Sequence, residues 1–201
     1  MAMTEKHAES ATAKIQSMLK LAAKEDDAWN TTWFPYNAYV WTDKQGRQIS
    51  SDNYRSFRLN DPLDLPEISD AKKDKLILFR NAIERGFEAC EKRKQFRLDT
   101  PDIATLKLRI ALCNHLEKAN NDSRKARIKP FVSWNFGAGF PLVNARYLID
   151  LLTILPDAVL YTISPYKAIK APIYAVSVYG DAILMPALDK AKHDEIDAQG
   201  A

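Results

Sequence analysis

The sequence predicts an α+β protein, with helical N-terminal and central segments and a C-terminal β-α-β-β-β sheet. Apolar residues recur at helical spacing in the first and middle thirds of the chain. Residues 131–186 instead read as a strand, a short helix and three further strands. Because 46% of the 201 residues are apolar, the chain can bury a substantial core.

The N-terminal third combines one helix with an aromatic-rich hairpin. Residues 8–28 are expected to be helical, with one apolar stripe that contains Ile15, Met18, Leu19 and Ala22. Residues 29–57 hold three of the four tryptophans, which either fill a small core or stack on a ligand. Residues 39–49 read as a β-hairpin in which Gly46 supplies the positive φ of the turn.

Two prolines predict the main boundary of the chain. Pro62 and Pro66 make residues 61–66 a connector that neither a helix nor a sheet interior tolerates well. We therefore expect an N-terminal region of residues 1–66, an α+β domain of residues 67–188 and a flexible tail of residues 189–201.

Two helices are expected in the central segment. The first is capped by Ser69 or Asp70, runs to about Lys92 and has an apolar face of Leu76, Phe79, Ile83, Phe87 and Cys90. A short strand at residues 95–98 follows. The second helix is expected to start at residues 100–102 with Thr100 as its cap and to end near Asn120.

The C-terminal third supplies the expected sheet. A strand at residues 128–136 is followed by a bend at Gly137 and Gly139 and by a helix at residues 144–155 that Pro156 ends. Three strands follow, near residues 158–163, 173–178 and 182–185. The sequence shows no internal repeat of useful length.

Residues that could support catalysis are scarce. Of the three histidines, His7 and His193 lie in segments expected to be mobile, and His115 lies in the last turn of a predicted helix. No zinc or calcium motif occurs. The glycines of residues 136–140 lack the third glycine and the long helix of a phosphate loop, so they indicate a turn between strands. We expect no enzymatic activity, no cofactor and no metal, and two reduced cysteines on apolar helix faces.

The charge of the chain is concentrated in its centre. The net charge is only +3, but residues 72–129 hold 16 basic and 8 acidic residues. The positive field of these residues could attract phosphates. Alternatively, the residues form a solvated surface that keeps the protein soluble. The candidate nucleic-acid-binding residues are Lys92, Arg93, Lys94, Arg97, Arg124, Lys125, Arg127 and Lys129.

A motif in the last third resembles a known family. Its residues are Val143, Asn144, Tyr147, Leu148, Asp150 and Leu152, followed by alternating strands that end in Leu184, Met185 and Pro186. This pattern, over residues 131–186, resembles the C-terminal half-domain of the bacterial DNA polymerase III sliding clamp. The resemblance implies a non-enzymatic protein built from domains of two β-α-β-β-β halves, with helices lining a DNA-sized hole. It also implies that Met185 and Pro186 border a pocket for peptides of partner proteins.

Two functional hypotheses follow. The first is a cytoplasmic, clamp-like binding protein that associates with DNA or a replication protein, as part of DNA replication in a mobile genetic element. The alternative is an interaction or inhibitor protein of a phage or plasmid that acts on a host nuclease or defence complex. No apolar run approaches the ~20 residues that span a bilayer, so no membrane partner is expected. Self-association through sheet edges is left open.

Overall fold

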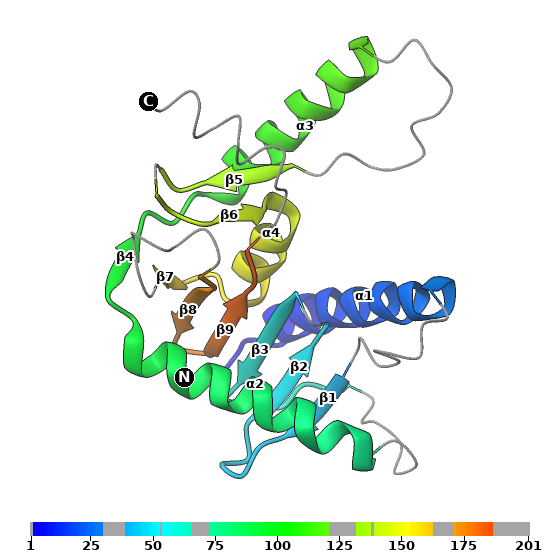
Figure 1. The fold of residues 1–201 in the computed structure, drawn as a ribbon, viewed down its shortest axis with the longest axis vertical. Coiled ribbons are helices and arrows are strands. Elements are labelled where there is room, and N and C mark those ends of the chain that lie inside the picture. The colour runs from blue at the N-terminus through cyan, green and yellow to red at the C-terminus, as the bar shows by residue number, and fades with distance from the viewer. Residues whose placement is uncertain are drawn as a thin grey trace.

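The computed structural model describes residues 2–29, 39–52, 54–65, 73–120, 132–137, 139–162 and 171–186 (Figure 1). Within these residues it contains four helices and two sheets, which confirms the α+β class. The helices are α1 (Glu5–Trp29), α2 (Lys73–Arg93), α3 (Ile103–Asn120) and α4 (Ala145–Ile154). In this part of the chain no helix has the length and apolar character needed to cross a membrane.

A seven-stranded antiparallel sheet is the centre of the fold, with the strand order β1-β2-β3-β9-β8-β7-β4. Its strands are β1 (Tyr39–Thr42), β2 (Gln48–Ser51), β3 (Arg55–Leu59), β4 (Phe96–Leu98), β7 (Val159–Thr162), β8 (Ile173–Ser177) and β9 (Gly180–Leu184). A separate two-stranded sheet pairs β5 (Ser133–Asn135) with β6 (Leu142–Asn144). As predicted, the glycines between β5 and β6 make a turn, in which Gly137 and Gly139 both have positive φ.

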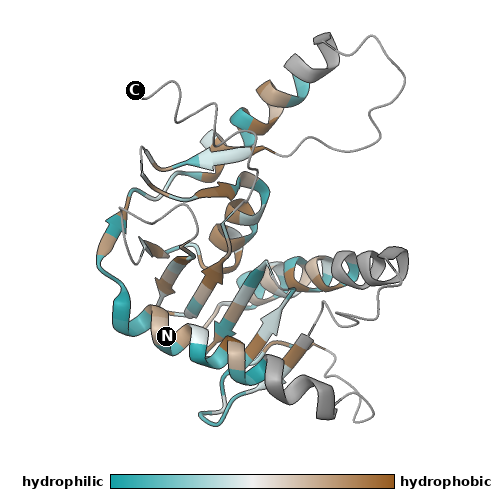
Figure 2. Cartoon of the chain, viewed as in Figure 1, coloured by the Kyte–Doolittle hydropathy of each residue, from teal (hydrophilic) through white to brown (hydrophobic). Residues whose placement is uncertain are grey.

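Helices cover the seven-stranded sheet on both faces, because successive residues of its strands point to opposite sides. On β8, Ile173 and Ala175 point into the larger core, which also contains residues of α1, α3 and α4. Tyr174 points the other way, into a smaller core with Phe87 and Cys90 of α2. Figure 1 shows α2 in front of the sheet, and Figure 2 shows apolar residues concentrated in β7–β9 and α4.

The sheet contains an internal repeat that the sequence did not reveal. The unit α1-β1-β2-β3 matches the unit α4-β7-β8-β9, and their last strands, β3 and β9, pair antiparallel at the centre. The registers match as well: Ser50 pairs with Phe57 as Ala175 pairs with Ala182, and both pairs are separated by the same distance in sequence. Since α1 and α4 also pack against each other, an approximate two-fold axis passes between β3 and β9.

This arrangement changes two expectations. The strands β7–β9 and α4 form as predicted, but β5 is not part of their sheet, because it pairs only with β6 among the described residues. The seven-stranded sheet also runs across the boundary expected at residues 61–66, since β3 pairs with β9 along its whole length. Leu63 and Leu65 of that connector are buried in the larger core.

The ends of two helices show how local chemistry sets their limits. Asn144, expected as the first residue of this helix, is its N-cap, with its side chain accepting from the Arg146 N–H. The expected cap of α3 was wrong by two residues. Asp102 Oδ1 accepts the Thr105 N–H at 2.8 Å, whereas the Thr100 hydroxyl lies 3.4 Å from the carbonyl oxygen of Ala158. A carboxylate accepts a hydrogen bond from orphan helix amides without a donor of its own, which favours Asp102.

Candidate nucleic-acid interface

Four of the predicted phosphate-binding residues lie together at one edge of the molecule. They are all exposed, and we call them the basic edge: Lys92, Arg93, Lys94 and Arg97. They gather there because α2 ends at Arg93 and the chain enters β4 three residues later. The intervening Gln95 donates its N–H to the Thr162 carbonyl at 3.3 Å, which ties this corner to β7.

The charges of the basic edge are not neutralised by neighbours. None of its four residues makes an ion pair with another described residue. Other cations of the protein are paired, such as Lys14 with Asp150 at 2.8 Å and Arg47 with Asp43 at 2.8 Å. The edge therefore keeps a positive field that can attract a phosphate chain.

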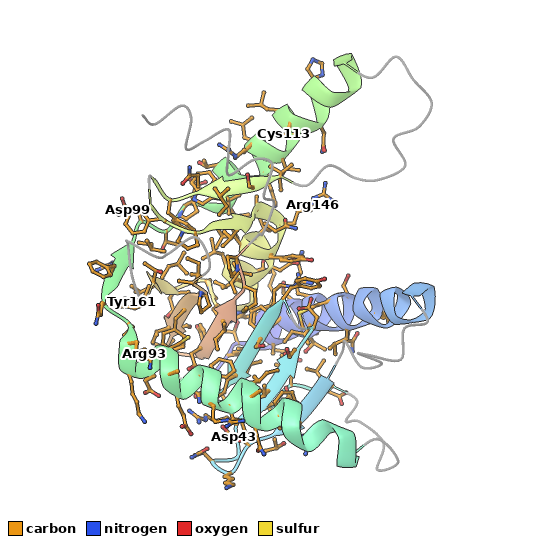
Figure 3. The ribbon with its side chains drawn as sticks, in the orientation of Figure 1. Asp43, Arg93, Asp99, Cys113, Arg146 and Tyr161 are labelled. Atoms are coloured by element: carbon orange, nitrogen blue, oxygen red, sulfur yellow. The ribbon has the colours of Figure 1, made fainter. Side chains whose placement is uncertain are left out.

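An aromatic ring lies among these cations. Tyr161 of β7 is directly opposite Arg97 of β4 in the strand register. The ammonium group of Lys94 lies 5.8 Å from the centroid of the Tyr161 ring, within the range of a cation–π contact. Figure 3 places Arg93 and Tyr161 on the same side of the molecule, where α2 ends.

The second predicted cluster cannot be placed beside the first. Arg124, Lys125, Arg127 and Lys129 all lie outside the described residues, so their proximity to the basic edge stays a prediction.

The predicted partner-binding residues lie at a different corner. Met185 is 43% exposed, and its N–H donates to the Tyr54 carbonyl at 2.9 Å. Tyr54 is 51% exposed, and its ring centroid lies 6.1 Å from that of Tyr147. With the half-buried Pro186, these residues form an exposed apolar surface that we call the methionine–tyrosine corner.

A buried ion network lies beneath this corner. Arg55 is 4% exposed and donates to Asp52 Oδ2 and to Asp150 Oδ2, each at 2.6 Å. Asp150 also accepts from Lys14 at 2.8 Å, and the Arg55 guanidinium lies 4.0 Å from the centroid of the Tyr147 ring. These contacts join α4 to α1 and β3. Every residue of α4 is consequently buried or half-buried, so little of the helix that the clamp resemblance would place against DNA is exposed.

A second buried cluster joins the two halves of the sheet beneath α2. Arg58 Nε donates to Asp181 Oδ1 at 2.8 Å, and the Tyr174 hydroxyl donates to Asp181 Oδ2 at 2.6 Å. Burial is the largest single influence on the pKa of Arg58 and lowers it, but the hydrogen bond to Asp181 and the nearby negative charges together raise the pKa overall. Burial and the same carboxylate raise the pKa of Tyr174. Covered by Phe87, whose ring centroid is 4.5 Å from the Arg58 guanidinium, this cluster is structural.

Two of the remaining reactive side chains, those of His7 and Cys90, are held by packing or hydrogen bonds within the fold. His7, expected in a mobile end, is instead fixed: its Nε2 lies 2.9 Å from the Ile154 carbonyl oxygen, and its ring packs edge-on against Tyr179 at 4.7 Å. His115 is exposed on α3. Burial raises the pKa of the Cys90 thiol to about 11, which keeps it protonated and a poor nucleophile at neutral pH.

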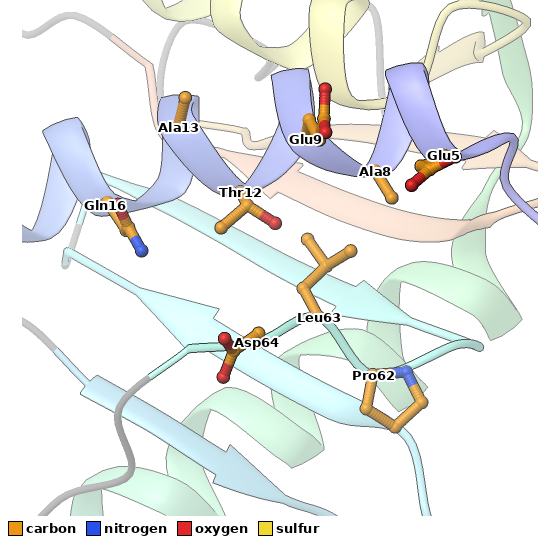
Figure 4. Close-up of a pocket in the computed structure, with 9 residues that line it drawn as sticks. All are labelled: Glu5, Ala8, Glu9, Thr12, Ala13, Gln16, Pro62, Leu63 and Asp64. Atoms are coloured by element: carbon orange, nitrogen blue, oxygen red, sulfur yellow. The ribbon is translucent and has the colours of Figure 1, made fainter.

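A cavity of about 500 Å³ lies between the first turns of α1 and residues 62–64 (Figure 4). Three carboxylates line it, from Glu5, Glu9 and Asp64. Among the described residues no group of three or more His, Cys, Asp or Glu side chains is placed to hold a metal ion. The negative charge of the three carboxylates would repel phosphates, so this cavity is not part of the candidate interface.

Sequence reasoning found the four cations of the basic edge but missed Tyr161. The pairing of β4 with β7 brings that ring to the cations, and the two strands are separated by the whole of α3, β5, β6 and α4. Comparisons of the chain with protein-family models, curated proteins and solved structures find no match.

Proposed function

We propose that the protein is a non-catalytic binding protein that associates with nucleic acid through its basic edge. The observation that carries this proposal is the gathering of four exposed cations, without ion-pair partners among the described residues, at one corner of a rigid sheet. Contacts from lysine and arginine to phosphates release counterions, and this release supplies sequence-independent affinity. A cytoplasmic role in the DNA replication of a mobile element would fit such binding.

The scaffold supports a clamp-like design. The resemblance to sliding clamps implies domains of two β-α-β-β-β halves; in support, the internal repeat has two α-β-β-β halves whose helices pack against each other, although β5 and β6 ahead of α4 form a separate sheet. The exposed face of α1, however, carries Glu5 and Glu9 as well as Lys6, and Lys14 and Asp150 neutralise each other. We therefore assign DNA contact to the basic edge and not to the face formed by α1 and α4.

The methionine–tyrosine corner favours a protein partner as well. Exposed apolar and aromatic side chains at the end of β9 suit a peptide that buries them. A replication protein is one candidate for this partner, and a host nuclease or defence complex is the other.

Fluorescence anisotropy with a labelled DNA oligonucleotide tests the proposal. Replacing Lys92, Lys94 and Arg97 together with glutamine should weaken binding on the order of tenfold or more in low salt and reduce the salt dependence of the affinity. The matched control replaces Lys6, Lys20 and Lys44, which are exposed and without ion pairs in the described structure. Equal losses in the two variants, or no binding by the unaltered protein, would contradict the proposal.

A further inference from the structure

The internal two-fold axis makes Trp41 and Tyr161 equivalent. In the first half of the repeat, Val40 of β1 pairs with Ser50 of β2. In the second half, Leu160 of β7 pairs with Ala175 of β8, the equivalent of Ser50. Trp41 and Tyr161, which come one residue later in β1 and β7, therefore occupy equivalent positions. Both side chains therefore point to the face of the sheet on which α2 lies. Their surroundings nevertheless differ.

Trp41 is covered and Tyr161 is not. Trp41 is 2% exposed, its Nε1 donates to Glu84 Oε1 at 3.0 Å, and the guanidinium of Arg80 lies 5.7 Å from its ring. Both partners belong to α2. Because α2 ends at Arg93, Tyr161 is only half-buried, and the described cation near its ring is the exposed Lys94.

A second ring lies on the edge strand β4, next to β7. Phe96 is 38% exposed and pairs with Thr162, one position along from the pair of Arg97 and Tyr161. Since neighbouring residues of a strand point to opposite faces, Phe96 of β4 and Tyr161 of β7 lie on opposite faces of this sheet edge, and Arg97 shares the face of Tyr161.

We infer that the basic edge binds single-stranded nucleic acid in preference to duplex, with bases stacked on Tyr161 and Phe96 and phosphates on the cations. This inference rests on the proposed function and names its ligand class. A duplex keeps its bases stacked on one another, whereas a flexible single strand can turn its bases toward rings on both faces of the sheet edge formed by β4 and β7. Stacking of this kind is tolerant of sequence, because every base has an aromatic face.

The test compares a labelled thymidine oligonucleotide with a hairpin duplex of equal charge, at one salt concentration. The unaltered protein should bind the single strand about tenfold or more tightly than the duplex, as expected for one or two stacked bases. The double variant Tyr161→Leu and Phe96→Leu should lose this preference and keep the salt dependence, because its cations are intact. Leu108→Ala, which removes an exposed apolar side chain of α3 that belongs to neither proposed binding surface, is the control.

Tyr161→Phe separates loss of the ring from loss of the fold, because it keeps a stacking surface and should retain the preference for single strands. Equal affinity for the two DNA forms, or unchanged single-strand binding by the folded double variant, would overturn this inference while leaving the proposed function intact. Failure of the unaltered protein to bind either form would overturn both.

Discussion

Gly180 lies at the centre of the sheet, where the two halves of the molecule meet. It pairs with Leu59 of β3 and has φ of 147°. A Cβ atom at this position would lie 2.2 Å from the Arg58 carbonyl oxygen and 3.0 Å from the Leu59 Cα. Both obstacles are backbone atoms of the paired strand, so they cannot move aside without breaking the pairing of β3 with β9.

Gly180→Ala should therefore destabilise the protein on the order of 3 kcal/mol or more in urea unfolding. Gly46→Ala is the control, because Gly46 also has a positive φ, of 82°, but a Cβ there would meet nothing within 4 Å. Its cost should be about 1 kcal/mol. Similar losses for the two variants would show that the close approach of β3 to β9 is not as described.

Cys90 illustrates how burial controls reactivity at a single residue. Burial raises the pKa of its thiol from 9.0 to about 11, so folding favours the protonated form. This contribution to stability is complete below pH 9.0 and is lost as the pH rises toward 11. At neutral pH, Cys90 should resist a thiol reagent in the native protein and react fully in denaturant, as measured by mass spectrometry of labelled peptides. Rapid labelling of native Cys90 would contradict the burial described here.

At the scale of elements, the junction of β3 with β9 depends on a buried ion pair. Arg58 and Asp181 are directly opposite in the strand register, and both are less than a tenth exposed. Asp181 also accepts from Tyr174 on β8. The carboxylate thus connects three adjacent strands beneath α2.

Asp181→Leu should cost about 3–5 kcal/mol, because it leaves the buried guanidinium of Arg58 with only the exposed Glu91 carboxylate, 3.9 Å away. Adding Arg58→Met should restore more than half of the lost stability, since replacing both charges removes the desolvation penalty. Chemical unfolding of the two variants measures this coupling. If the double variant is as unstable as Asp181→Leu alone, removing the second charge restores no stability, and the Arg58–Asp181 pair is then not buried away from water as described.

The elements differ in how well their sequences predict them. Apolar spacing located α1, α2 and α3, Pro156 marked the end of α4, and Gly46 located the β1–β2 turn, because these signals are local. The strand β3 was missed because Arg55 and Arg58 make it look exposed. Their partners Asp150 and Asp181 lie 95 and 123 residues away in sequence, so no local pattern shows that these charges are buried. The cations of the basic edge were found because they are adjacent in sequence.

At the scale of the whole molecule, the internal two-fold axis organises the fold. The axis was not visible in the sequence, because equivalent positions of the two halves have the same strand register but different residue types. Ile49 is equivalent to Tyr174, for example, and Ser50 is equivalent to Ala175. The sheet is not limited at Pro62, because β3, which precedes it, pairs along its whole length with β9. The departure from symmetry, with α2 over Trp41 and the exposed Lys94 beside Tyr161, coincides with the candidate interface.

The most direct test of this account is to map the DNA-binding surface by backbone NMR, comparing amide shifts of the labelled protein with and without a single-stranded oligonucleotide. If the basic edge binds DNA, the perturbed amides should cluster at residues 92–97 and around Tyr161, on the edge formed by β4, β7 and the end of α2. Perturbations confined to α1 and α4, the face that a sliding clamp would present to DNA, would contradict this account.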